Sequence, residues 1–247
     1  MLELRGVSKR FGGVVATDEV TLDVARGEVH ALIGPNGAGK TTLIGQVSGV
    51  LRTDVGRIVF NEVDITRLSA YARVHAGLAR SYQITSIFRR FSVLDNLALA
   101  VQARSGSSFS FWRPLSAESA LFDEARAIAA QIGLQEKTNQ VAATLAHGEQ
   151  RALEVGLALA TRPQLVLLDE PMAGMGPQES SRMIALIEKI RAQVTVLLVE
   201  HDMDAVFRLA DRISVLVSGR LIATGAPQAI RADPAVRKAY LGEELAA

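Results

Sequence analysis

A glycine-rich loop between an apolar segment and a helix is the feature that most constrains this chain. Residues 34–41 read Gly-Pro-Asn-Gly-Ala-Gly-Lys-Thr, which fits the pattern G-x-x-x-x-G-K-[ST]. The apolar residues before the loop predict a strand, and residues 41–48 predict a helix that ends at Gly49. Because this order of strand, loop and helix is the context that the motif requires, the loop predicts a phosphate-binding turn in an α/β fold.

The residue types in the loop each suit a triphosphate. Glycines let backbone N–H groups converge on the β-phosphate, and the start of the helix adds its dipole. The Lys40 ammonium reaches the β and γ oxygens, the Thr41 hydroxyl ligates Mg²⁺, and Thr42 donates to the α-phosphate. A chance glycine-rich turn does not explain the lysine and the hydroxyl together. The predicted nucleotide-binding residues are Gly34, Pro35, Asn36, Gly37, Ala38, Gly39, Lys40, Thr41 and Thr42.

A second apolar run, from Leu165 to Asp169, ends in two adjacent carboxylates. Ends of parallel strands are where an α/β sheet displays its chemistry. We expect Asp169 to hold Mg²⁺ through water and Glu170 to polarise the attacking water as a general base. The alternative is a pair of solvated carboxylates at a strand exit. A kinase with this loop would need a second substrate pocket, whereas a hydrolase needs only the water.

The rest of the chain alternates between strand and helix patterns on either side of a helical middle. Residues 20–24 alternate, turn at Arg26-Gly27 and run into 28–33, which predicts a β-hairpin. The helices expected in the middle span about 92–104, 117–132 and 148–160. After them we expect a strand at 165–169, a helix at 177–192, a strand at 194–200, a helix after Asp202 and a hairpin that turns at Ser218-Gly219. This order predicts a parallel sheet with crossover helices.

Composition excludes several classes of partner and site. The 27 basic and 26 acidic residues leave a net charge of +1, so no nucleic-acid footprint is present. The absence of cysteine rules out disulfides and Cys-ligated zinc, and the four histidines are too scattered to suggest a metal site. No apolar run approaches the roughly 18 residues of a membrane span, and the first residues lack a signal-peptide pattern. We therefore expect a cytosolic chain.

With the loop and the strand carboxylates in place, the chain resembles the ATP-binding cassette family over essentially its whole length. The resemblance implies a P-loop NTPase (RecA-like) α/β core with a mostly parallel sheet, an N-terminal antiparallel β subdomain and an inserted helical subdomain. The core and the β subdomain would comprise residues 1–84 and 161–247, and the helical subdomain residues 85–160. It also implies an ATPase, with ATP and Mg²⁺ as ligands, that works as one half of a dimer.

Three further site residues follow from this resemblance. Phe11, in Arg-Phe-Gly-Gly, matches the aromatic residue that stacks on adenine, and its alternative is a strand residue of the core. Gln83 matches the glutamine that reaches Mg²⁺ and the attacking water, and its alternative is a polar group at a strand edge. His201 matches the histidine that contacts the γ-phosphate, while Asp202 is expected to cap the next helix. Gln83 and His201 thus join Glu170 as predicted catalytic residues.

The family's signature loop, of the Leu-Ser-Gly-Gly-Gln type, is represented by residues 145–151, Leu-Ala-His-Gly-Glu-Gln-Arg. In the family this loop closes over the γ-phosphate bound by the opposite subunit, which implies roles for Ala146, Gly148 and Glu149. Ala146 lacks the hydroxyl, and Gly176 stands where many members have aspartate. Our hypothesis from these departures is a functionally lopsided dimer, in which this chain pairs with a related but different ATPase.

Within the family, the chain resembles the ATPases of branched-chain and hydrophobic amino-acid uptake systems. The supporting segments are residues 147–151, 172–175, 111–113 and 239–243. Such systems combine two ATPases with membrane permeases and a periplasmic solute-binding protein, which places this chain on the cytoplasmic face of the membrane as a peripheral subunit. No nucleic acid is expected as a partner.

Several alternatives stay open at this point. Residues 86–97 also resemble the lipopolysaccharide-export ATPase, and importers of urea, amides or aromatic acids share the uptake features. A soluble cassette ATPase, a nucleotide kinase and a non-catalytic subunit are further alternatives. Residues 83–91 are expected to receive a permease helix, with core packing as the alternative for Phe88 and Phe91. For the aromatic segment 105–115, a self-packed loop and a membrane or permease contact both remain possible.

Overall fold

A computed structural model describes residues 1–81, 87–104 and 115–241 of the chain. The chain forms two compact units, one of residues Met1–Arg73 with Arg191–Ala247, and one of residues Val74–Ile190. The second unit contains two strands and a helix besides the predicted helical insert. The division expected from the sequence, at residues 84/85 and 160/161, therefore differs from these compact units and stays a prediction.

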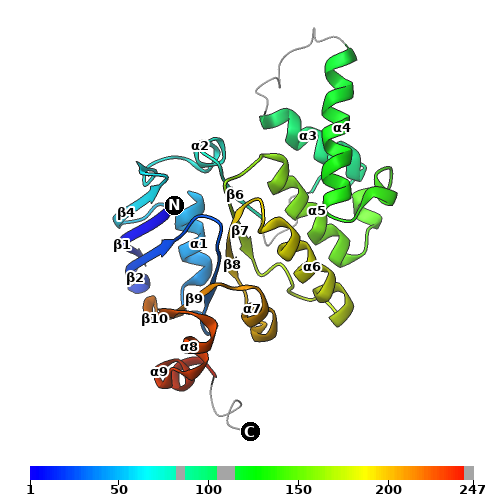
Figure 1. Cartoon of the computed structure of the whole chain (residues 1–247). Coiled ribbons are helices and arrows are strands. Elements are labelled where there is room, and N and C mark those ends of the chain that lie inside the picture. The colour runs from blue at the N-terminus through cyan, green and yellow to red at the C-terminus, as the bar shows by residue number, and fades with distance from the viewer. Residues whose placement is uncertain (82–86, 105–114, 242–247) are drawn as a thin grey trace. The chain divides into compact units, whose positions relative to one another are not determined.

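The first unit contains a four-stranded antiparallel sheet at its N-terminal end (Figure 1). Its order is β2 (Val14–Val24), β1 (Leu2–Phe11), β4 (Val55–Phe60) and β5 (Val63–Asp64). Leu2 pairs with Val24 on one side and with Phe60 on the other, and all three are buried. The alternating pattern of the sequence thus builds a sheet with one packed face, as predicted for the antiparallel subdomain.

The second sheet segment of this unit is built around two fully buried strands, β3 and β8. β3 (Val29–Ile33) lies between β8 (Thr195–Val199) and β9 (Arg212–Val217) and runs parallel to both, and β10 (Arg220–Gly225) pairs antiparallel with β9. Every residue of β3 and β8 is buried. The predicted hairpin of residues 20–24 with 28–33 is therefore wrong. A strand buried on both faces belongs in a parallel sheet, while its alternating neighbour β2 joins the antiparallel one.

The first unit also contains helices, of which the one after the phosphate loop and the one after Asp202 are predicted from the sequence. They are α1 (Lys40–Ser48), α2 (Ala70–His75, which ends in the second unit), α7 (Met203–Leu209), α8 (Pro227–Ala232), α9 (Pro234–Val236) and η3 (Arg237–Leu241). α1 ends at Gly49, which has a φ of 81° and donates its N–H to the Gln46 carbonyl. Asp202 caps α7 by accepting the Ala205 N–H at 3.2 Å, as expected.

The second unit combines two parallel strands with a group of helices (Figure 1). The strands are β6 (Leu78–Arg80) and β7 (Leu165–Asp169). The helices are α3 (Val93–Arg104), α4 (Leu115–Gln131), α5 (His147–Ala160) and α6 (Pro177–Ile190), with short turns η1 (Gln135–Lys137) and η2 (Ala142–Thr144). α3 begins with the predicted capping box, since Asp95 N–H donates to the Ser92 hydroxyl at 3.0 Å. The helical insert is thus confirmed.

One buried arginine holds the far end of the loop helix α1. Arg73 of α2 is 1% exposed. Its guanidinium donates to four carbonyl oxygens, those of Gln46, Val47, Thr66 and Leu68, at 2.7–3.1 Å. Burial lowers the pKa of Arg73 to about 10, against the opposing influence of Asp64. A guanidinium suits this site because its planar donors reach several oxygens at once.

We predict that Arg73→Met destabilises the protein by about 3 kcal/mol, because several buried carbonyl oxygens lose their donors. Urea unfolding monitored by circular dichroism measures the loss. Arg57→Met is the control, since Arg57 is exposed on β4 and its replacement should stay within about 0.5 kcal/mol of the wild type. Equal stability of the Arg73 variant and the wild type would contradict the structural role of Arg73.

Candidate functional site: a phosphate-binding loop and a carboxylate-bearing strand end

The predicted phosphate loop connects the buried strand β3 to the first turn of α1 in the first unit. Asn36 and Gly37 are exposed at its tip, and Ala38 N–H closes the turn by donating to the Pro35 carbonyl at 3.1 Å. α1 begins at Lys40, and its N-cap residue, Gly39, makes no side-chain capping hydrogen bond. The loop therefore presents an uncapped helix start toward which an anion is attracted.

Two glycines let this loop fit against neighbouring backbone. A Cβ atom at Gly34 would lie 2.1 Å from the Leu216 carbonyl oxygen, and one at Gly39 would lie 2.1 Å from the Ala16 carbonyl oxygen. Gly39 also has a φ of 102°, a region that other residues rarely adopt. The Gly219 N–H donates to the Ala38 carbonyl at 2.9 Å and joins the loop to the β9–β10 turn. The loop is thus held by backbone contacts from two directions.

Lys40 is buried with its ammonium turned back into the loop. It is 7% exposed, and its Nζ donates to the Gly34 and Pro35 carbonyl oxygens at 2.6 and 3.1 Å. These carbonyls hold the charge in the middle of the loop. Thr41 is exposed and Thr42 half-buried at the start of α1, so both predicted hydroxyl donors lie at the loop.

The first unit also carries two of the residues predicted from the family resemblance. His201 follows β8, and Leu32 of β3 is in register with Val199, so the ends of these two strands lie side by side. The His201 side chain is 57% exposed, and its backbone N–H donates to the Glu200 carboxylate at 3.0 Å. Phe11 ends β1 with 48% exposure, and the Lys9 ammonium lies 5.5 Å from its ring centroid. An exposed ring is suited to stacking, which disfavours the core alternative for Phe11.

The two predicted carboxylates follow β7 in the second unit. Asp169 is 2% exposed, and its Oδ2 accepts from Arg80 Nη2 at 2.8 Å. Its Oδ1 is buried without a hydrogen-bond partner among the residues that the structure describes. Glu170 is half-buried with a φ of 48°. A buried carboxylate oxygen with an unused lone pair fits a ligand to a cation or its water, which a solvated pair would not provide.

Signature-loop residues form the N-terminal end of α5. Ala146 is the N-cap, and its N–H donates to Glu149 Oε2 at 3.2 Å, while Glu149 Oε1 pairs with Lys137 Nζ at 2.7 Å. Gly148 N–H donates to Glu179 Oε1 at 3.1 Å. The alanine offers no side-chain cap, so the start of α5 relies on the carboxylates of Glu149 and Glu179.

Sequence reasoning missed Arg80 and Glu179 as members of these sites, and it missed the burial of Glu154. Arg80 and Glu179 contact predicted site residues that are 89 and 31 positions away in sequence, and no local pattern reveals such contacts. Glu154 of α5 is buried, and burial raises its pKa although Arg151 donates to it at 2.9 Å. The spacing of apolar and charged residues on α5 predicts the helix. It does not reveal which residues Arg80 and Glu179 contact.

Glu28, His30 and Ser214 form a buried chain of hydrogen bonds in the first unit. These are the residue types of a catalytic triad, but a substrate has no access to them. His30 Nε2 lies 2.8 Å from the Ser214 hydroxyl, and Nδ1 lies 3.1 Å from Glu28 Oε1. Burial opposes ionisation of Glu28, but hydrogen bonds from His30 and the Ala25 N–H hold its pKa below the usual value. Because His30 and Ser214 are completely buried, no substrate reaches them, and the chain ties β3 to β9.

Some predicted residues lie outside the described ranges. They are Gln83 and the aromatic segment 105–114, and their roles stay predictions. Phe88 and Phe91 are described, and their exposed rings stack with centroids 5.5 Å apart. In the ranges that are described, no helix combines the length and the apolar character of a membrane span.

Comparisons with known proteins identify the family of this chain. Residues 17–173 match the family model described as ABC transporter, and residues 220–246 match the one described as branched-chain amino acid ATP-binding cassette transporter. The chain is 37% identical to the high-affinity branched-chain amino acid transport ATP-binding protein LivG of Escherichia coli, and the alignment covers 98% of each protein. It is 35% identical to the lipopolysaccharide export system ATP-binding protein LptB of the same organism, over 99% of this chain and 98% of LptB.

A solved ATP-binding cassette of an ABC transporter in its ADP conformation superposes with a TM-score of 0.86 at 30% identity, covering 98% of this chain and 99% of that one. The fold and the phosphate loop define a nucleotide-binding P-loop ATPase. This chain belongs to the ATP-binding subunits of the ABC transporter family.

The close approach of the loop to neighbouring backbone yields a prediction. Gly39→Ala should destabilise the protein at least twice as much as Gly37→Ala, because both substitutions strain a positive φ but only residue 39 places a Cβ against a carbonyl oxygen. The strain alone costs about 1–2 kcal/mol. Thermal unfolding of the two variants measures the difference, and equal losses would contradict the packing of this loop.

Proposed function

We propose that this chain is the ATP-hydrolysing subunit of an importer for branched-chain or related hydrophobic amino acids. The observation that carries the choice of solute is the match of residues 220–246 to the branched-chain family model, beside the identity to LivG over the whole chain. The ATPase itself rests on the loop geometry and the family. Binding and cleavage of the nucleotide would close two ATPase subunits and move a membrane permease.

The loop residues would grip the phosphates with backbone N–H groups, and Phe11 would stack on the adenine. Lys40 would exchange its two carbonyl acceptors for β and γ oxygens, which the loop allows because its ammonium already lies there. Thr41, Asp169 and Gln83 would hold Mg²⁺, and the unused buried oxygen of Asp169 fits this role. When bound, Mg²⁺ would neutralise charge on the phosphate oxygens.

Glu170 would act on the attacking water. Its position directly after Asp169 places a second carboxylate at the same strand end, where it can accept hydrogen bonds from water and orient it. His201 follows β8, which lies beside β3, the strand that leads into the phosphate loop. Its side chain is therefore suited to contact the γ-phosphate. Together with Gln83 these residues complete the half-site that this chain supplies.

The signature loop would complete the half-site of a second ATPase subunit. Ala146 removes a hydroxyl donor to phosphate, an interaction worth about 1.5–3 kcal/mol, and Gly176 removes the usual carboxylate of the loop before α6. These departures support pairing with a different ATPase that supplies the stronger signature loop. The assembly would include membrane permeases and a periplasmic solute-binding protein and would hold this chain at the cytoplasmic face of the membrane.

Lipopolysaccharide export is the second candidate, supported by the similarity to LptB. The two candidates share the nucleotide chemistry, and they differ in the permease and in the C-terminal segment. The match of that segment to the branched-chain model favours uptake. Urea, amide and aromatic-acid importers remain candidates for the exact solute.

We predict that Glu170→Gln lowers the rate of ATP hydrolysis by a factor on the order of 100 or more while Mg·ATP still binds, because the carboxamide cannot act as the base. A phosphate-release assay and a nucleotide-binding assay on the purified transporter separate the two effects. Glu188→Gln, an exposed change of the same kind on α6, is the control. Full activity of the Glu170 variant would remove this residue from catalysis.

Purification of a tagged chain from native membranes tests the kind of transporter. We expect two permease subunits and a second, different ATPase to co-purify, and the reconstituted complex to take up radiolabelled leucine in an ATP-dependent manner. An export permease pair, or a complex with two copies of this chain, would contradict the uptake proposal or the heterodimer, respectively.

A further inference from the structure

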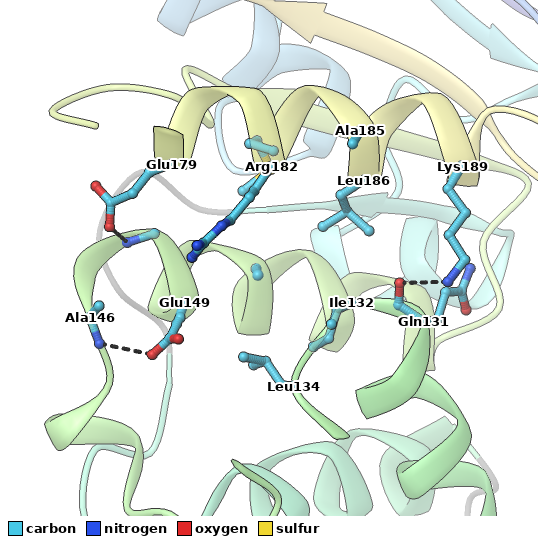
Figure 2. A pocket seen from close by; sticks show the side chains of 14 residues that line it. Gln131, Ile132, Leu134, Ala146, Glu149, Glu179, Arg182, Ala185, Leu186 and Lys189 are labelled. Carbon is cyan, nitrogen blue, oxygen red and sulfur yellow. Dashed lines mark hydrogen bonds between the residues drawn. The ribbon is translucent and has the colours of Figure 1, made fainter. Parts of the chain in front are cut away.

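One carboxylate connects the signature helix to the loop before α6. Gly148 is the second residue of α5, so its N–H has no acceptor within the helix, and it donates instead to Glu179 Oε1 at 3.1 Å (Figure 2). Glu179 lies in the first turn of α6, and its Oε2 accepts the Gly176 N–H at 3.4 Å. A single side chain thus caps the N-terminal ends of two helices.

Gly148 allows this approach because it has no side chain. A Cβ atom at residue 148 would lie 2.9 Å from Glu179 Oε1 and 3.1 Å from Glu179 Cβ. The contact is therefore a close fit between the two helices rather than a chance meeting of surface groups. It also places a full negative charge at the N–H that the signature loop would offer to a phosphate.

A neighbouring carboxylate is bound more firmly. Glu149 accepts the Ala146 N–H at 3.2 Å and also pairs with the Lys137 ammonium at 2.7 Å. Among the described residues, Glu179 accepts from two backbone N–H groups, and the second, at 3.4 Å, is beyond the usual hydrogen-bond range. No cation within ion-pair distance of Glu179 occurs among the described residues. Glu179 is thus the more readily displaced of the two carboxylates.

The structure provides a second place for the Glu179 carboxylate. A cavity of about 350 Å³ lies between α5, α6 and the 131–134 turn, and Glu179 and Arg182 both line it. Arg182 follows Glu179 by three residues on α6, a spacing that brings two side chains together on a helix. Within the described part of the chain Arg182 has no hydrogen bond or ion pair, and Figure 2 shows it extending from α6 toward α5.

We propose that Glu179 is a displaceable cap of the signature helix, which leaves the Gly148 N–H for Arg182 when a phosphate of the opposite subunit's nucleotide arrives. The proposal rests on the proposed function, in which the signature loop closes over that nucleotide. Two anionic acceptors at one N–H repel each other, so the observed hydrogen bond opposes closure, and an ion pair of the displaced carboxylate with Arg182 would favour it. Glu179 is a positioning residue in this account, since it acts through Gly148.

The test uses the transporter complex purified from membranes through a tag on this chain, and measures ATP hydrolysis as a function of ATP concentration. Glu179→Gln keeps an acceptor for the Gly148 N–H but loses the charge, so it should lower the KM for ATP by roughly fivefold, as expected for a charge-assisted bond replaced by a neutral one. Arg182→Gln should raise the KM by at least about twofold, because the displaced carboxylate loses its second partner. Glu188→Gln is the matched charge control.

A cap with only a structural role gives a different result. Glu179→Gln would then leave the KM unchanged or raise it, and Arg182→Gln would have no effect on the KM, and either outcome overturns the proposal. Thermal unfolding of each variant checks that the fold persists, and Glu179→Asp, which keeps the charge on a shorter side chain, serves if the glutamine variant is unstable, with an expected KM below that of the wild type. Failure of the wild-type complex to hydrolyse ATP would instead contradict the proposed function.

Discussion

The phosphate loop of this protein depends on the close approach of backbone to backbone at Gly34 and Gly39. At both positions a carbonyl oxygen of another segment occupies the space of a side chain. This packing fixes the turn that carries Lys40 into the loop, where two carbonyls hold its ammonium. The charge is therefore in position before a nucleotide arrives, which lowers the cost of ordering the site on binding. At the other end of α1, Arg73 secures the helix that follows the loop.

Carboxylates have three different functions in the second unit, and their surroundings distinguish them. Asp169 is buried, paired with Arg80 and left with one unused oxygen, which suits a ligand site. Glu149 is paired with a lysine and stabilises the start of α5. Glu179 bridges two helix ends and has no cation partner in the described part of the chain, so its position is the most easily changed of the three. The same functional group thus serves stability and, as we propose, metal binding and control of closure.

Local signals in the sequence predicted the helices and strands well. What the sequence could not predict depends on contacts between segments that are far apart in the chain. The strand before the loop, the capping box at Ser92 and the strand that ends at Asp169 all follow from neighbouring residues. The pairing of β3 with strands about 170–180 residues away has no local signal, and for that reason the hairpin prediction was wrong. The burial of Arg73 and the contact of Gly148 with Glu179 likewise depend on segments that meet only in the folded chain.

The central claim is that the loop around Lys40 binds a nucleotide through its backbone and this lysine. Calorimetric titration of the purified chain with Mg·ATP, compared with Lys40→Ala, tests it most directly. We predict a clear binding heat for the wild type and its loss in the variant. Circular dichroism of the variant checks that it keeps the wild-type fold after the hydrogen bonds from Lys40 to the Gly34 and Pro35 carbonyls are removed. No binding by the wild type, or equal binding by both proteins, would contradict the account.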